Sequence, residues 1–266
     1  MLRVISGILL LLTGLAVQAA VVGEEVSYRA GDTLLKGYLA YDDAVEGKRP
    51  GILVVHEWWG HNAYARQRAE MLADLGYIAL AVDMYGDGKT AAHPDDAGKF
   101  SGAVRRNLPL MKDRFNAARR FLNAQPGVDP DRNAAIGYCF GGSVVLEMAR
   151  AGADLDGVAS FHGSLGGLGP VADTVKARIL VLNGADDPFV SAEQIAVFKD
   201  DMDAAGADYT FINYPGAMHS FTNPGADALG EQFGLPLAYD AAADAASWQA
   251  LQDFFRDIFE SPVGDT

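Results

Sequence analysis

Four continuous apolar runs that alternate with amphipathic segments constrain the fold of this chain more than any other feature. The runs occupy residues 51–56, 77–82, 133–137 and 178–183. Strands that are apolar on both faces are typical of a parallel sheet covered by helices on each side. Segments with helical periodicity lie at 63–75, 110–122, 142–151, 192–205 and 244–259. This alternation predicts an α/β fold with a mostly parallel central sheet and helices on both faces.

The remaining apolar segments predict the edges of this sheet. Residues 24–29 and 33–41 are short runs separated by a glycine-containing turn, which is typical of an N-terminal hairpin. Residues 209–214 predict a further strand. The sequence contains no repeat, low-complexity tract or linker that would divide it, so residues 20–266 predict one domain.

Two polar, turn-rich stretches interrupt the regular pattern, at 85–107 and 223–237. We expect both to be irregular loops. Such loops either overhang a functional site or connect elements at the surface, and the sequence leaves both readings open.

The first residues, 1–19, are typical of a Sec signal peptide. Arg3 precedes an apolar run over 4–17, and the Val-Gln-Ala sequence that ends at Ala19 suits cleavage after that residue. The alternative is an uncleaved membrane anchor, but the run is shorter than the roughly 20 residues that a spanning helix needs. We therefore expect an exported protein, periplasmic or secreted, with no stable membrane anchor.

Composition argues against two classes of protein. The chain has 35 acidic and 21 basic residues and a formal net charge of -14, which argues against nucleic acid as a partner. Its single cysteine, Cys139, excludes an intramolecular disulfide framework, although export would permit one. This lone thiol therefore needs another explanation.

Cys139 lies between an apolar run and a helical segment, in the sequence Gly137-Tyr138-Cys139-Phe140-Gly141. This is the context of a nucleophile elbow, with cysteine in the usual serine position. The two glycines allow a tight turn in which the central residue holds a strained conformation. A helix N-terminus favours the thiolate that attacks carbon. A buried structural cysteine is the alternative.

A nucleophile of this kind needs a base and an orienting acid, which follow it in the order acid, then histidine. Asp187 follows the run that ends at residue 183, and His219 follows the strand expected over 209–214. Asp186 stays open as the alternative acid, because spacing is loose in loops.

Three segments together resemble the signature segments of the dienelactone hydrolase (carboxymethylenebutenolidase) family. They read Gly-Tyr-Cys-Phe-Gly-Gly, Gly-Ala-Asp-Asp-Pro-Phe-Val and Gly-Ala-Met-His-Ser-Phe, and the resemblance extends over about residues 51–259. It implies an α/β-hydrolase fold and a triad of Cys139, His219 and Asp187. The implied activity is cleavage of a small-molecule ester or lactone through an acyl-enzyme, for which we expect no cofactor and no metal.

The resemblance also implies roles for residues near the triad. Glu57 matches a family glutamate that contacts the resting thiol and helps to deprotonate it. The backbone N–H groups of Trp58 and Phe140 are expected to form the oxyanion hole. We further expect a substrate pocket that includes Trp59, Tyr85 and Phe221, with packing beneath the loops as the alternative for the tryptophans.

The chain departs from the family at the arginines that hold the carboxylate of dienelactone. Gly86, Asp87 and Asn223 stand at or near those positions. Without a charge-assisted partner a buried carboxylate is costly, so we expect a neutral substrate rather than dienelactone itself. Positive charge from the 85–107 stretch would weaken this expectation if it reached the site, whereas a solvated surface is the alternative for its cations Lys89, Arg105 and Arg106.

Two further readings stay open. The same acyl-enzyme serves an acyltransferase or a thioesterase, and a non-catalytic binding protein can use the same fold. The sequence determines neither the substrate nor the oligomeric state.

Overall fold

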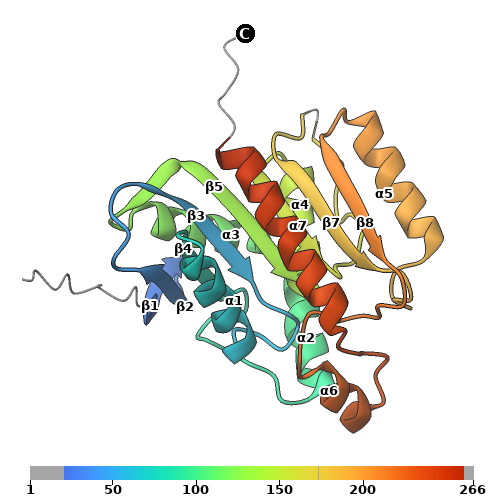
Figure 1. Cartoon of the computed structure of the whole chain (residues 1–266). Coiled ribbons are helices and arrows are strands. Elements are labelled where there is room, and N and C mark those ends of the chain that lie inside the picture. Colours follow the sequence, from blue (N-terminus) through green and yellow to red (C-terminus); the bar gives the residue numbers. More distant parts are fainter. Residues whose placement is uncertain (1–20, 173, 261–266) are drawn as a thin grey trace, which may run out of the picture.

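A twisted eight-stranded sheet forms the centre of the protein (Figure 1). The computed structural model describes residues 21–172 and 174–260, so the expected signal peptide lies outside the described residues. The strands run in the spatial order β1-β2-β4-β3-β5-β6-β7-β8. In chain order they are β1 (Val21–Ala30), β2 (Thr33–Asp42), β3 (Arg49–Val55), β4 (Ile78–Val82), β5 (Val128–Tyr138), β6 (Gly157–Phe161), β7 (Arg178–Gly184) and β8 (Tyr209–Tyr214).

The sheet is mostly parallel, as the apolar runs predict. β1 pairs with β2 as an antiparallel hairpin, and β2 is antiparallel to β4. Every other neighbouring pair, from β4 across to β8, is parallel. The expected fold class and the N-terminal hairpin are therefore confirmed. Because the carboxyl ends of parallel strands lie on the same side of the sheet, the loops after β3, β5, β6, β7 and β8 converge there.

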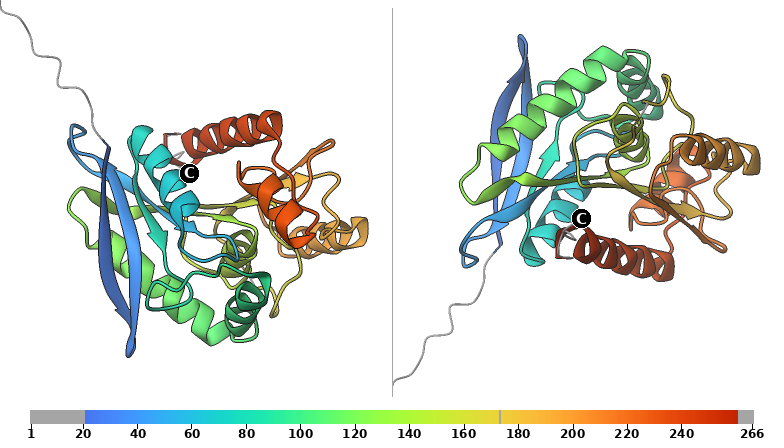
Figure 2. Two further views of the ribbon diagram at one scale, coloured as in Figure 1. Left: turned by 90° about the horizontal axis from the view of Figure 1, so that it is seen from below. Right: turned by 90° about the horizontal axis from the view of Figure 1, so that it is seen from above.

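Helices cover both faces of the sheet, as Figure 2 shows from two opposite directions. The helices α1 (Ala63–Asp74) and α7 (Ala241–Phe259) pack on one face, and their buried side chains join one hydrophobic cluster. The helices α3 (Leu108–Asn123), α4 (Phe140–Arg150) and α5 (Ala192–Ala204) cover the other face. Among the described residues, no helix combines the length and the apolar character that crossing a bilayer requires.

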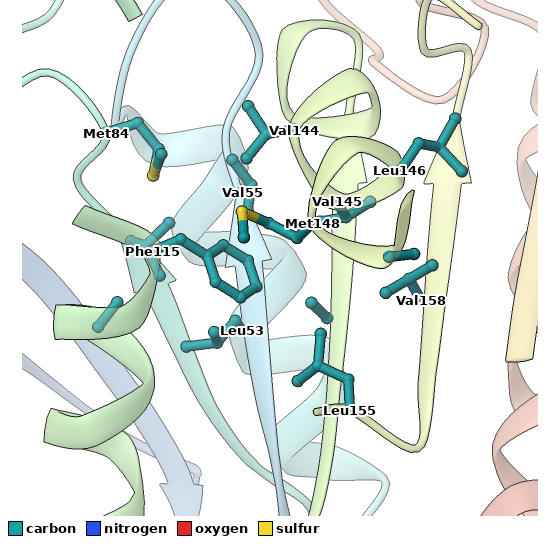
Figure 3. Packing of buried hydrophobic residues seen from close by; sticks show 14 of the residues in the cluster. Leu53, Val55, Met84, Phe115, Val144, Val145, Leu146, Met148, Leu155 and Val158 are labelled. Atoms are coloured by element: carbon teal, nitrogen blue, oxygen red, sulfur yellow. The ribbon is translucent and has the colours of Figure 1, made fainter. Parts of the chain in front are cut away.

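The larger hydrophobic cluster lies between the sheet and the helices α3 and α4 (Figure 3). Leu53 and Val55 of β3 point into it together with Phe115 of α3 and Val144 of α4. All four side chains are at most 1% exposed. Truncating a buried phenylalanine of this kind to alanine costs about 3 to 5 kcal/mol. This layer therefore packs directly against β3 and β5.

Three elements differ from the sequence expectation. The helix α2 (Pro94–Arg105) lies within the stretch 85–107, and α6 (Ala226–Phe233) lies within 223–237, so the expectation of irregular loops is wrong there. Both helices are short and contain glycine, which obscures their periodicity. Strand β6 has no counterpart among the expected strands, because its five residues include Gly157, Ala159 and Ser160.

Candidate active site

The turn between β5 and α4 holds Cys139 in a strained backbone conformation. Its φ of 53° and ψ of -112° are unusual for a residue with a side chain. A Cβ atom at Gly137 would lie 2.1 Å from the Gly141 carbonyl oxygen, and one at Gly141 would lie 2.2 Å from that of Val55. Only glycine fits at either position. The local sequence therefore builds the elbow, with Cys139 half-buried at the start of α4.

Cys139, His219 and Asp187 form a continuous hydrogen-bonded series. The Nε2 atom of His219 lies 3.1 Å from Sγ of Cys139, and its Nδ1 lies 2.8 Å from Oδ2 of Asp187. Asp187 follows β7 and is 3% exposed, and His219 follows β8. Asp186 points to solvent at the same turn. The geometry thus favours Asp187 over Asp186 as the partner of the histidine.

The surroundings of His219 favour a protonated ring. Burial opposes the charged form, but the attraction of Cys139 and the hydrogen bonds to Asp187 and Cys139 outweigh it. Together they raise the pKa of His219 from 6.5 to about 10. A protonated imidazole can donate a hydrogen bond to Sγ of Cys139, 3.1 Å away. The arrangement can therefore supply a nucleophile and a proton to one substrate.

Glu57 lies beside this series but does not contact the thiol, contrary to the expectation from the resemblance. Its Oε1 accepts a hydrogen bond from the Ser220 hydroxyl at 3.0 Å, and its Oε2 accepts one from Nδ2 of Asn223 at 2.6 Å. Burial raises the pKa of the Glu57 carboxyl, although these two hydrogen bonds oppose the shift. Asn223 takes up the carboxylate, and the thiol of Cys139 pairs with His219 instead.

The N–H groups expected to form the oxyanion hole belong to Trp58, after β3, and to Phe140, at the start of α4. Neither Trp58 N–H nor Phe140 N–H donates a hydrogen bond to a backbone or side-chain acceptor in the described part of the chain. Two contacts fix the turn that carries Trp58. The Tyr85 hydroxyl donates to the Trp58 carbonyl at 2.9 Å, and Nδ1 of His56 lies 2.5 Å from the Glu57 carbonyl.

A cavity of about 370 Å³ opens onto Cys139 and His219. Its other lining residues are mostly apolar and come from several loops: Trp58, Arg105, Ser164, Phe189, Val190, Leu235 and Leu237. Leu235 and Leu237 follow α6, which identifies the 223–237 stretch as one wall. A second cavity, of about 630 Å³, lies at the opposite edge of the sheet among side chains such as Arg119 and Asp154, away from the triad.

The three residues expected in the substrate pocket do not belong to this lining. Trp59 is 5% exposed and packs against Trp58 and Phe233, with ring centroids 5.0 and 5.9 Å apart. Tyr85 and Phe221 are also buried, at 4% and 0%. Trp59 and Tyr85 contact Trp58, which lines the cavity, whereas Phe221 packs against His162 and Tyr214. Large aromatics next to a site signature pack as readily as they bind, and only the tertiary structure separates the two uses.

Arg105, at the end of α2, lies in the cavity wall. Its guanidinium stacks over the Phe140 ring, 5.7 Å from the centroid. Its Nε is buried without a hydrogen-bond partner among the described residues. The reading of this cation as solvated surface is therefore wrong for Arg105, whereas Lys89 and Arg106 are exposed.

His162 lies against the elbow, and no sequence pattern singled it out. It follows β6, is fully buried, and its Nδ1 lies 3.1 Å from the Cys139 backbone nitrogen. Its sequence signal is weak because the strand before it is short. No three histidine, cysteine, aspartate or glutamate side chains within residues 21–172 and 174–260 group closely enough to hold a metal ion.

Known proteins share this architecture. A sequence profile described as the dienelactone hydrolase family matches residues 35–259. The chain is similar to a solved dienelactone hydrolase-like promiscuous phosphotriesterase from metagenomic libraries, with a TM-score of 0.83 and 37% identity. That match covers 90% of this chain and 99% of the other.

More distant relatives extend over most of the chain as well. The protein usf of Aquifex pyrophilus is 26% identical over 241 residues, which cover 89% of this chain and 99% of the relative. A dienelactone hydrolase from Anabaena variabilis shares the fold at 22% identity, with a TM-score of 0.57 and coverage of 82% and 99%. The chain belongs to the dienelactone hydrolase family of α/β-hydrolases, and it is a hydrolase of ester or lactone bonds.

Proposed function

We propose that the protein cleaves its substrate through an acyl-enzyme on Cys139, with His219 as acid and base and Asp187 as the orienting acid. The observation that carries this proposal is the pair of contacts at His219, with Sγ of Cys139 at 3.1 Å and Oδ2 of Asp187 at 2.8 Å. Both are within the reach that proton transfer requires.

Each group has a defined part in this proposal. The Cys139 thiolate attacks the carbonyl carbon, and the resulting oxyanion accepts hydrogen bonds from the Trp58 and Phe140 N–H groups. The C–O bond then breaks as protonated His219 gives its proton to the leaving alcohol. The neutral ring next takes a proton from water, whose oxygen attacks the acyl-enzyme. The thiolate leaves, which restores the resting ion pair.

Glu57 acts on the histidine turn rather than on the thiol. Its carboxylate oxygens accept hydrogen bonds from Ser220 and Asn223, which are one and four residues after His219. Ser220 has a positive φ of 61°, so the turn needs such support. We assign Glu57 as a positioning residue that keeps the imidazole in line with the sulfur.

The lining of the cavity supports a neutral ester or lactone as substrate. Leu235, Leu237, Phe189 and Val190 present apolar surface to the acyl or alcohol part. The side chain of Asn223 donates to Glu57 and leaves no arginine-like clamp at that position.

Arg105 supports a second candidate, a substrate that carries an anionic group. It lines the same cavity, and its buried Nε lacks a partner among the described residues. An arginine with unused donors binds a carboxylate strongly. The two candidates differ in one measurable quantity, the preference between matched neutral and anionic substrates.

The nucleophile is tested by substitution and by a substrate panel. Cys139→Ala should abolish turnover of esters, lactones and thioesters while the protein stays folded, and iodoacetamide should inactivate the unsubstituted protein. Full activity in Cys139→Ala would overturn the proposal. Product analysis with and without added alcohol separates hydrolysis from acyl transfer, since a transferase would form a new ester, and the panel shows whether thioesters react faster.

A further inference from the structure

His162 connects the two halves of the site through one side chain. Its Nδ1 lies 3.1 Å from the Cys139 backbone nitrogen, and its Nε2 lies 2.8 Å from Oγ1 of Thr222. Cys139 belongs to the elbow, and Thr222 belongs to the turn that carries His219. The ring is 0% exposed and does not line the cavity at the triad.

The hydrogen bonds at its two nitrogens fix the protonation of the His162 ring. The Cys139 N–H can only donate, and it is shared between Nδ1 and the Phe161 carbonyl, at 3.1 and 3.0 Å. Nδ1 must therefore be the bare nitrogen, and Nε2 carries the proton that it donates to Thr222. The ring is neutral in this arrangement. Burial agrees with this, because it lowers the pKa of His162 well below the usual value.

Thr222 is itself held in place by two further hydrogen-bonding contacts. Its Oγ1 lies 2.6 Å from the Tyr64 hydroxyl, and its carbonyl accepts a hydrogen bond from the Arg68 guanidinium at 2.6 Å. Arg68 also pairs with Asp244 of α7 at 2.6 Å. The histidine turn is thereby fixed to α1 and α7, and His162 fixes the elbow to that turn.

Backbone strain is concentrated in the residues around His162. Within the described residues, four residues other than glycine have positive φ, and three of them meet here: Cys139 at 53°, His162 at 40° and Ser220 at 61°. Such a conformation is unfavourable for a residue with a side chain, and it persists only where the surrounding structure holds it. The rings of His162 and His219 also pack edge to face, 5.3 Å apart.

We propose that His162 is a positioning residue, whose hydrogen bonds to the Cys139 backbone and to Thr222 hold the nucleophile and His219 in register. Its effect on turnover rests on the proposed function. Its effect on the geometry of the Cys139–His219 pair does not. Because the ring does not line the cavity, its loss should lower kcat and leave KM unchanged.

Three variants test the connection. Thr222→Val removes the hydroxyl at nearly constant volume, and Thr222→Ser keeps it. His162→Asn keeps an acceptor close to Nδ1 and tolerates positive φ, but it does not reach Thr222. A misplacement of about 1 Å can lower turnover about 100-fold, so Thr222→Val and His162→Asn should each lower kcat by roughly 10- to 100-fold. Thr222→Ser should restore most of it. The double variant should lose little more than either single one, because both break the same connection.

A second readout does not need a substrate. The rate of Cys139 alkylation by iodoacetamide at neutral pH reports how His219 is placed beside the sulfur, and it should fall in Thr222→Val and His162→Asn but not in Thr222→Ser. Ser247→Ala, which removes another buried hydroxyl, serves as the control for lost stability. If no ester or lactone is turned over but the alkylation rates differ as expected, the proposed function fails and this inference stands.

Three results would overturn the inference. One is unchanged kcat and unchanged alkylation in folded Thr222→Val and His162→Asn. Another is a raised KM with unchanged kcat, which would place His162 in substrate binding. The last is a loss in Ser247→Ala equal to that in Thr222→Val, which would make the contact a contribution to stability only.

Discussion

At the scale of single residues, the two adjacent aspartates after β7 have opposite environments. Asp187 is 3% exposed and bonded to His219, and it also accepts the Phe189 N–H at 2.8 Å. Asp186 is exposed. One peptide unit therefore separates a positioned carboxylate from a solvated one.

This contrast predicts very different effects for the same substitution. Asp187→Asn should lower kcat by roughly three to four orders of magnitude, because the amide no longer holds the required tautomer. Asp186→Asn is the matched control and should change kcat by less than about twofold. Steady-state kinetics on one ester decides between them. The reverse ranking would transfer the role to Asp186.

The raised pKa of His219 predicts that hydrolysis declines at high pH. The ring must be protonated to supply the leaving alcohol, so kcat/KM should fall as the pH rises through about 10. Iodoacetamide alkylation should persist above that pH, because the thiolate needs no proton donor. In the unfolded chain the pKa returns to about 6.5, so the stabilisation from this group is complete below pH 6.5 and is lost as the pH approaches 10. Parallel pH profiles of hydrolysis and alkylation test the assignment, and loss of both together would contradict it.

The position of Arg105 in the cavity wall bears on the preference between neutral and anionic substrates. If the natural substrate is neutral, kcat/KM should be higher for a neutral ester than for its carboxylate-bearing analogue of similar size. If the protein prefers the anion, Arg105→Gln should reduce that preference roughly tenfold or more, since a partly exposed cation contributes less than a buried one. Arg106→Gln, one residue further and exposed, should leave the preference unchanged. An anion preference that survives Arg105→Gln would exclude Arg105 as its source.

At the scale of elements, the junction of β5 and α4 depends on space as much as on chemistry. A Cβ atom at Gly141 would lie 2.2 Å from the Val55 carbonyl oxygen, so β3, β5 and α4 cannot approach as they do with any other residue there. The nearest atoms belong to the backbone of Val55 and His56, so they cannot rotate away.

Gly141→Ala should therefore destabilise the fold by about 3 kcal/mol or more, beyond the ordinary cost of overpacking. Gly98→Ala is the control. Gly98 is an exposed residue of α2, and a Cβ atom there would meet nothing within 4 Å, so alanine should stabilise the helix by up to about 1 kcal/mol. Urea unfolding of both variants measures the difference. Equal midpoints would show that the junction tolerates the extra atom.

At the scale of the whole molecule, we propose export and removal of residues 1–19. The charged start, the apolar run and the small residues before position 20 support it. Intact-mass measurement of the protein recovered from the periplasm or medium of a bacterial host should show a chain that begins at Ala20. Arg3→Glu should impair export if the export machinery recognises the positive charge at the start of the signal peptide. A full-length, membrane-bound product would contradict the proposal.

Much of the fold and part of the site follow from short stretches of sequence. The central strands were predictable because strands buried on both faces must be continuously apolar, and the elbow because Gly137 and Gly141 permit one tight turn around Cys139. The positions of Asp187 and His219 followed from their place after β7 and β8. Elements with small or mixed residues, such as β6, α2 and α6, gave too weak a period to detect.

The sequence by itself determined the fold class and identified the residues that can take part in chemistry, because both are encoded within a few positions along the chain. Only the tertiary structure decided which partner each residue has. Glu57 bonds to Asn223, 166 positions away, rather than to the thiol, and His162 meets Thr222 across 60 positions. Such contacts depend on how strand ends and turns meet in space, and no local period or motif records that distance.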